Sequence, residues 1–132
     1  MDTDSKPISS SILLEGDLTD KILGAAFKLL NTLGAGFLEK VYENALAIEL
    51  RKAGLSVECQ KPFPVRYDGE TVGEYQADIV VAGKVIVECK AASNLDPVHE
   101  AQLLNYLKAS GLRVGLLINF GRAKMQYRRL VA

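Results

Sequence analysis

The chain has 132 residues, of which 48% are hydrophobic and 24% are charged, an ordinary composition for one soluble globular domain. Its 16 basic and 16 acidic residues cancel, so any argument for nucleic-acid binding has to come from local clustering. No apolar run approaches the roughly 20 residues of a membrane span. The N-terminus also lacks the basic and apolar segments of a secretory signal. We therefore expect a cytoplasmic protein that does not enter a membrane.

The chain contains two cysteines, Cys59 and Cys89, and both fall in predicted strands. In a chain without an export signal, two cysteines are more often reduced than paired in a disulfide. They are also too few for the ligand set of a usual zinc site. We expect both to be structural residues.

The hydrophobic pattern predicts two helices, three strands, a third helix and two more strands. Apolar residues at helical spacing run from Asp17 to Leu33, where a glycine-rich segment ends the first helix. Asp96 and Pro97 suit the N-cap and the first position of the third helix. The predicted ranges are a flexible tail over 1–16, then one domain over 17–132 with helices over 17–33, 38–53 and 97–110 and strands over 56–67, 70–81, 84–90, 113–120 and 125–131. Two prolines interrupt the strand over 56–67 and suit an edge of the sheet or a bend.

The connections between these elements predict the fold class. Short turns join the first three strands, which are therefore antiparallel, and the helix over 97–110 is a crossover between two parallel strands. The continuously apolar strand over 113–120 suits a sheet interior that is covered on both faces. We predict an α/β fold with a mixed β-sheet of about five strands flanked by helices on both faces.

Two opposite charges stand two residues apart in the apolar stretch KVIVECK, residues 84–90. Successive strand side chains alternate between faces, so Glu88 and Lys90 share one face of the sheet. Charges on a largely buried strand are costly unless they are paired or bind something. The pattern therefore indicates either a solvated ion pair on an edge strand or a metal site.

Asp78, in the preceding strand, places a second carboxylate ten residues before Glu88. Carboxylates from neighbouring strands can hold a hard divalent cation, with water and phosphate oxygens completing the shell. An adjacent lysine can orient or deprotonate an attacking water. The turn sets a condition, because a two-residue loop pairs residue 77 with Glu88, whereas a three-residue connection or a bulge pairs Asp78 with Glu88. A surface ion-pair network is the alternative interpretation.

Two helices carry side chains that could join this cluster. Gln102 and Tyr106 lie four residues apart, hence on one helix face, and could contact a phosphate or position Lys90. Alternatively they belong to a partly exposed helix face, with the tyrosine hydroxyl extended toward solvent. His99 precedes them and is interpreted as a surface residue at the helix N-terminus rather than as a ligand. Glu39 and Glu43 share a face of the second helix, and either could complete a metal shell or belong to a solvated surface.

Four separated blocks of the sequence, taken together, resemble a known family over about residues 17–130. GAGFLEKVYENAL contains Gly36, Glu39 and Tyr42 at the spacing that names the GxxExxY proteins. The later blocks VIVECKA, PVHEAQLLNYLKASG and VGLLINFG follow in the same order. That family is placed in the PD-(D/E)XK nuclease superfamily, so the resemblance implies a restriction-endonuclease-like fold.

The resemblance also implies roles for individual residues. Asp78, Glu88 and Lys90 map onto the metal-binding and catalytic positions of the superfamily. Gln102 and Tyr106 resemble the QxxxY element of its exonuclease-like branch, and Glu39 resembles the helix carboxylate of such sites.

The last twenty residues contain five basic residues and no acid, which favours contact with a phosphate backbone or, equally, a solvated terminal strand. No helix-turn-helix or zinc-finger pattern is found, so little sequence specificity is expected. The basic residues are Arg113, Arg122, Lys124, Arg128 and Arg129.

Our leading interpretation is a Mg²⁺- or Mn²⁺-dependent nuclease that acts on nucleic acid, DNA in preference to RNA. The rival is a catalytically silent adaptor that keeps the fold and binds nucleic acid or protein; a homodimer or an unidentified protein partner is left open. The expected roles are metal binding by Glu39, Asp78, Glu88 and the backbone carbonyl of Cys89, orientation of water by Lys90, and contacts to phosphate or lysine by Gln102 and Tyr106.

Overall fold

The computed structural model describes residues 13–132. The predicted tail over 1–16 therefore lies mostly outside the described residues. None of the helices within residues 13–132 is long and apolar enough to cross a membrane. The elements are α1 (Gly16–Leu33), α2 (Glu39–Lys52), β2 (Val57–Tyr67), β3 (Glu70–Val81), β4 (Val85–Lys90), α3 (Pro97–Ser110), β5 (Val114–Asn119) and β6 (Gln126–Val131).

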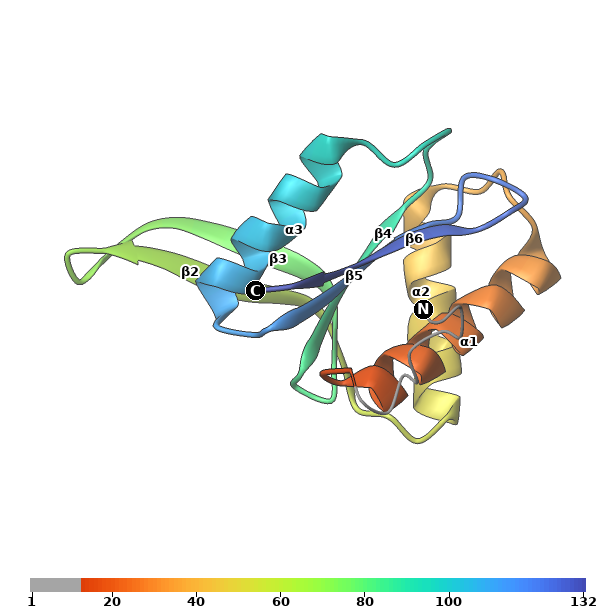
Figure 1. Cartoon of the computed structure of the whole chain (residues 1–132), viewed down its shortest axis with the longest axis horizontal. Coiled ribbons are helices and arrows are strands. Elements are labelled where there is room, and N and C mark those ends of the chain that lie inside the picture. The colour runs from red at the N-terminus through yellow and green to blue at the C-terminus, as the bar shows by residue number, and fades with distance from the viewer. Residues whose placement is uncertain (1–12) are drawn as a thin grey trace, which may run out of the picture.

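The strands form one five-stranded mixed sheet in the order β2-β3-β4-β5-β6, and this confirms the predicted α/β class (Figure 1). Among the strands of the described residues, only β4 and β5 are parallel, because α3 carries the chain between them. The prediction that prolines interrupt the strand over 56–67 is wrong, since β2 runs unbroken through Pro62 and Pro64. β2 is an edge strand, where a residue without a backbone N–H is tolerated.

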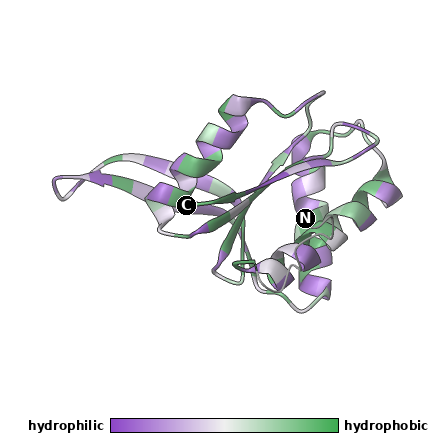
Figure 2. Ribbon diagram, in the orientation of Figure 1, coloured by the Kyte–Doolittle hydropathy of each residue, from purple (hydrophilic) through white to green (hydrophobic). Residues whose placement is uncertain are grey.

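Helices cover both faces of the sheet, as predicted. One face packs on α1 and α2 through a core that includes Val85, Val87 and Cys89. The other face packs on α3 through a core that includes Ile86 and Leu103. Figure 2 shows hydrophobic residues concentrated in the central strands. Alternation along β4 thus sends its odd-numbered residues toward α1 and α2 and its even-numbered residues toward α3.

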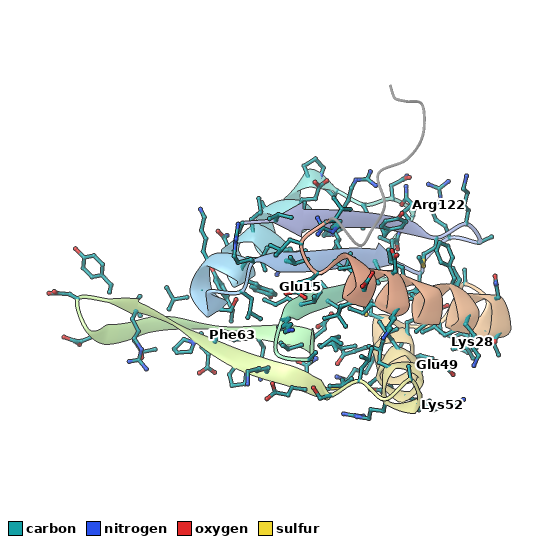
Figure 3. The ribbon with its side chains drawn as sticks, turned by 60° about the horizontal axis from the view of Figure 1, so that its bottom comes forward. Glu15, Lys28, Glu49, Lys52, Phe63 and Arg122 are labelled. Atoms are coloured by element: carbon teal, nitrogen blue, oxygen red, sulfur yellow. The ribbon has the colours of Figure 1, made fainter. Side chains whose placement is uncertain are left out.

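α1 and α2 also meet through charged side chains at their outer surface. Lys28 of α1 lies 3.0 Å from Glu49 of α2, and Lys52 lies 3.6 Å from the same glutamate (Figure 3). Exposed ion pairs of this kind contribute little to stability, about 0–1 kcal/mol each. The helix pair is therefore held mainly by its apolar contacts.

The hairpin of β2 and β3 is longer than the rest of the sheet, and its outer part extends beyond the body of the protein (Figure 1). Near its base, Phe63 and Tyr75 pair across the two strands and pack against the core beneath α3. At its tip, Tyr67 is 76% exposed. The side of the hairpin that carries Phe63 and Tyr75 therefore faces α3.

α3 begins and ends as the sequence predicted. The Asp96 side chain accepts a hydrogen bond from the N–H of Val98, and Pro97 occupies the first turn. His99 accepts a hydrogen bond from the Asp96 N–H at Nδ1, which closes a capping box. Gly111, with φ of 75°, provides the left-handed C-cap. His99 thus has a structural role at the helix N-terminus.

Candidate active site

The register of β3 and β4 places Asp78 directly opposite Glu88. The ladder pairs Val81 with Val85 and Ile79 with Val87, so the next position pairs residues 78 and 88. A three-residue connection over 82–84 produces this register, with the Lys84 N–H donating to the Val81 carbonyl at 2.9 Å. The connection needs positive φ at Ala82 and at Gly83, 54° and 64°. The geometric condition on the two carboxylates is therefore met.

The two carboxylates replace the backbone ladder at the point where the regular pairing of β3 and β4 ends. The Cys89 N–H donates to Asp78 Oδ2 at 2.9 Å, and the Asp78 N–H donates to Glu88 Oε2 at 2.7 Å. Each carboxylate is thus held by the backbone of the other strand. Their positions follow from the main chain and not from flexible surface rotamers.

Burial and mutual repulsion make both carboxyl groups hard to ionise. Glu88 is 4% exposed, and burial together with the nearby charge of Asp78 raises its pKa to about 8. Burial and the Glu43 charge raise the pKa of Asp78, against the lowering effect of the Cys89 N–H. A nearby cation would favour the ionised forms of these two adjacent, buried carboxyl groups.

Lys90 is the last residue of β4, and its side chain contacts Gln102 of the predicted Gln102 and Tyr106 pair on α3. Its Nζ lies 3.5 Å from Gln102 Oε1, at the outer limit of a hydrogen bond. The Gln102 side-chain amide in turn donates to the Tyr106 hydroxyl at 3.2 Å. The three side chains form a chain of contacts from β4 to α3.

Both candidate carboxylates of α2 lie near this edge of the sheet. Glu39 Oε2 is 3.4 Å from the backbone nitrogen of Ala91, directly after Lys90. Glu43 is only 5% exposed and accepts hydrogen bonds from Lys40 at 3.0 Å and from Gln60 at 2.8 Å. Glu43 is thus already paired with the Lys40 ammonium. Among the described residues, the one hydrogen-bond contact of Glu39 is the long one to the Ala91 N–H.

The donor set suits a hard divalent cation without forming a closed cage. Within residues 13–132, no three Asp, Glu, His or Cys side chains gather closely enough to hold a metal by themselves. Asp78 and Glu88 supply two carboxylates, so further oxygens would have to come from the backbone, water or phosphate. Mg²⁺ usually binds proteins in this way, through one or two carboxylates.

Comparisons with known proteins show the family to which the chain belongs. The family model of the PD-(D/E)XK nuclease superfamily matches residues 16–130. The chain belongs to the PD-(D/E)XK nuclease superfamily. Nucleases of this superfamily generally use divalent metals. The narrower resemblance to the GxxExxY proteins stays a prediction.

One solved structure is similar to the chain in fold. The crystal structure of SSO0001 superposes with a TM-score of 0.55 at 15% sequence identity, covering 89% of this chain. The match spans 58% of that protein, so the likeness concerns the fold alone. No curated protein matches the sequence.

Two polar residues that the sequence did not single out hold the candidate site together. Gln60 has φ of 52° in the middle of β2 and donates to Glu43, and no sequence signal marks that conformation. Asn119 is fully buried, and its side chain bonds the backbone of Ala92 and Gly121. A side chain at Gly121 would lie 2.3 Å from the Ala92 carbonyl. The sequence signal for these contacts was an asparagine at the end of an otherwise apolar strand.

Tyr42, the last residue of the GxxExxY pattern, organises the loop between α1 and α2. Its ring is fully buried and stacks on Phe120 with ring centroids 5.0 Å apart. Its hydroxyl donates to the Gly34 carbonyl at 2.6 Å and accepts from the Phe37 N–H at 3.1 Å. These bonds fix the start of α2, the helix that carries Glu39.

We expect Tyr42→Phe to lower the free energy of unfolding by about 1–2 kcal/mol, because two hydrogen bonds are lost while the stacking is kept. Denaturant unfolding measures the change, and Tyr67→Phe, at the exposed hairpin tip, is the matched control. Equal stability of Tyr42→Phe and the parent protein would contradict this role.

The basic residues near the C-terminus do not form one patch, because the fold separates them. Arg128 and Arg129 are neighbours in β6 and so project to opposite faces. Arg128 lies 3.9 Å from Glu100, while Arg129 bonds the Leu14 carbonyl. Arg122 lies in the β5–β6 loop and bonds Asn94. The predicted contact of this region with a phosphate backbone stays a prediction.

Proposed function

We propose that the protein is a Mg²⁺- or Mn²⁺-dependent nuclease that hydrolyses phosphodiester bonds, with DNA preferred to RNA. The observation that carries the proposal is the register of β3 and β4, which puts Asp78 opposite Glu88 with Lys90 on the same strand. The contacts from Lys90 to Gln102 and Tyr106 support it independently.

Asp78, Glu88 and the backbone carbonyl of Cys89 would hold the ion, and Glu39 would complete the protein's share of the shell. When bound, a divalent ion supplies positive charge at the phosphoryl group being transferred. The raised pKa values of Asp78 and Glu88 suit this assignment, because burial and neighbouring charges disfavour ionisation of both carboxyl groups and a bound cation would favour it.

The protein's own groups then act on the water and the phosphate. Lys90 orients a water molecule for in-line attack on phosphorus, and its free-amine form takes up the proton of that water, becoming the ammonium that faces the phosphate. The new phosphorus–oxygen bond forms as the bond to the leaving oxygen breaks, and that oxygen accepts a proton. Gln102 keeps the Lys90 ammonium turned toward the phosphate, and Tyr106 holds Gln102 in place.

Cleavage of linear, circular and single-stranded DNA and of RNA, each with Mg²⁺, Mn²⁺ or EDTA, tests the proposal. We expect DNA to be cleaved faster than RNA, cleavage to need the metal, and Asp78→Asn to abolish it. Asp68→Asn is the matched control, since Asp68 lies exposed in the hairpin turn at φ of 54°, where asparagine is well tolerated.

Thermal unfolding with increasing metal separates this proposal from a silent adaptor. A metal present at ten times its Kd stabilises the folded state by about 1.4 kcal/mol, and Asp78→Asn should lose most of that. An adaptor that has lost the site predicts no metal-dependent rise in Tm. Absence of both cleavage and stabilisation would overturn the nuclease proposal.

A further inference from the structure

We propose that the groove between α3 and the β2–β3 hairpin binds a single strand of nucleic acid and leads it to the catalytic site. This inference rests on the proposed nuclease function and specifies its substrate class. The groove consists of two pockets of about 500 and 330 Å³. Tyr75 of β3 and Asn105 of α3 line both pockets, which therefore adjoin. Figure 1 shows α3 running alongside the hairpin where it leaves the body.

The inner end of the groove reaches the candidate active site. Gln102 lines the inner pocket and is the residue that contacts Lys90 and Tyr106. Tyr106 also packs against Tyr75, with ring centroids 4.9 Å apart. A strand lying in the groove would therefore pass the lysine that is proposed to activate water.

The outer end of the groove is positively charged. Arg66 and Lys108, both exposed, line the outer pocket, and neither pocket has an acidic lining residue. Glu74, next to Tyr75 on β3, projects to the opposite face of the hairpin. Gln102 and Lys108 are six residues apart on α3, about 9 Å along the helix axis. Lys108 is therefore placed to contact a phosphate further along the strand than the scissile one.

The size and the aromatic wall of the groove favour one strand over a duplex. Pockets of about 300–1,000 Å³ hold ligands of drug size, which is also about the size of a nucleotide. Tyr75 is half-buried, with one side against Tyr106, and its remaining surface lines both pockets. A base can stack on such a ring only when it is free of its own duplex.

Fluorescence anisotropy in EDTA tests the groove without requiring cleavage. The probe is a fluorescein-labelled single-stranded DNA of about 12 nucleotides, compared with the same sequence as RNA and as blunt duplex. We expect tighter binding of either single strand than of the duplex. For Arg66→Ala with Lys108→Ala, the slope of log K against log salt should become less negative by roughly 1.4, since about 0.7 is lost per phosphate contact on single strands.

A second pair of variants tests base stacking. Tyr75→Leu should weaken binding roughly 5- to 150-fold, while Tyr75→Phe, which keeps the aromatic face, should bind as the parent does. For the double variant Arg66→Ala with Lys108→Ala, the control is Lys52→Ala, which removes the charge of an exposed lysine on α2 away from the groove. Thermal unfolding of each variant reports that the fold is retained.

The outcomes separate the groove from the nuclease. If the double variant keeps the parental salt slope, or if duplex binds as tightly as single strand, the groove proposal falls even where metal-dependent cleavage is seen. If the groove variants change binding as expected while neither cleavage nor metal-dependent stabilisation is seen, the groove stands and the nuclease proposal falls.

Discussion

Lys90→Ala is expected to lower the rate of metal-dependent cleavage by about 10²–10⁴-fold, the usual contribution of a positioned proton-transfer group. Lys90 is the ammonium nearest to Gln102 in the described contacts and follows Glu88 by two residues on β4. Because its side chain is only partly buried, the change should leave thermal unfolding almost unaltered. Single-turnover cleavage of labelled single-stranded DNA measures the effect.

Two further variants make this test specific. Lys84→Ala removes an exposed lysine at the opposite end of the same strand and should keep full activity. Lys90→Arg keeps the positive charge but cannot release its proton at ordinary pH, so it should remain slow if proton transfer matters. Full activity in Lys90→Ala, or equal losses in Lys84→Ala, would show that the lysine is not part of the catalytic machinery.

In the absence of metal, the free energy of unfolding is expected to fall as pH rises from about 4.5 to about 8. The pKa of Glu88 is about 8 in the folded protein, against an ordinary value of 4.5. Between these values the folded protein keeps a proton that the unfolded chain has released, so raising the pH favours unfolding. The slope approaches about 1.4 kcal/mol per pH unit, or a few kcal/mol over the whole window. The raised pKa of Asp78 acts in the same direction.

Glu88→Gln should flatten this dependence, because the amide is neutral at every pH in the window and nearly the same size. Urea unfolding at several pH values in EDTA measures it, and Glu58→Gln, a side chain 54% exposed in β2, is the control. Added Mg²⁺ should stabilise the parent more at pH 8 than at pH 6, since the ion needs ionised carboxylates. A parental stability that is constant between pH 5 and 8 would contradict the burial argument.

Local signals in the sequence predicted the elements well because each depends on nearby residues. The glycine-rich segment after Leu33, the Asp96–Pro97 start of α3 and Gly111 at its end act within a turn or two of the chain. Pro62 and Pro64 suggested an edge or a bend, and the tertiary structure decided for an unbroken edge strand, where a proline removes no ladder hydrogen bond.

The residue types of the candidate site could be proposed from the sequence, but their geometry could not. Opposite charges in an apolar strand drew attention to Glu88 and Lys90, yet the place of Asp78 depended on whether two or three residues connect β3 and β4. Gln60 and Asn119 were missed because their roles arise from positive φ and from burial. The basic residues near the C-terminus were grouped by sequence, whereas strand alternation sends Arg128 and Arg129 to opposite faces of the sheet.

The sequence by itself determined the order and bounds of the helices and strands, and the residue types of a carboxylate and lysine site. These properties follow from hydrophobic periodicity and turn chemistry, which are local. Only the tertiary structure decided that Asp78 faces Glu88, that Glu43 is already paired, and that α3 and the hairpin enclose a groove. Those features join residues far apart in the chain, and they form only when strand register and packing bring them together.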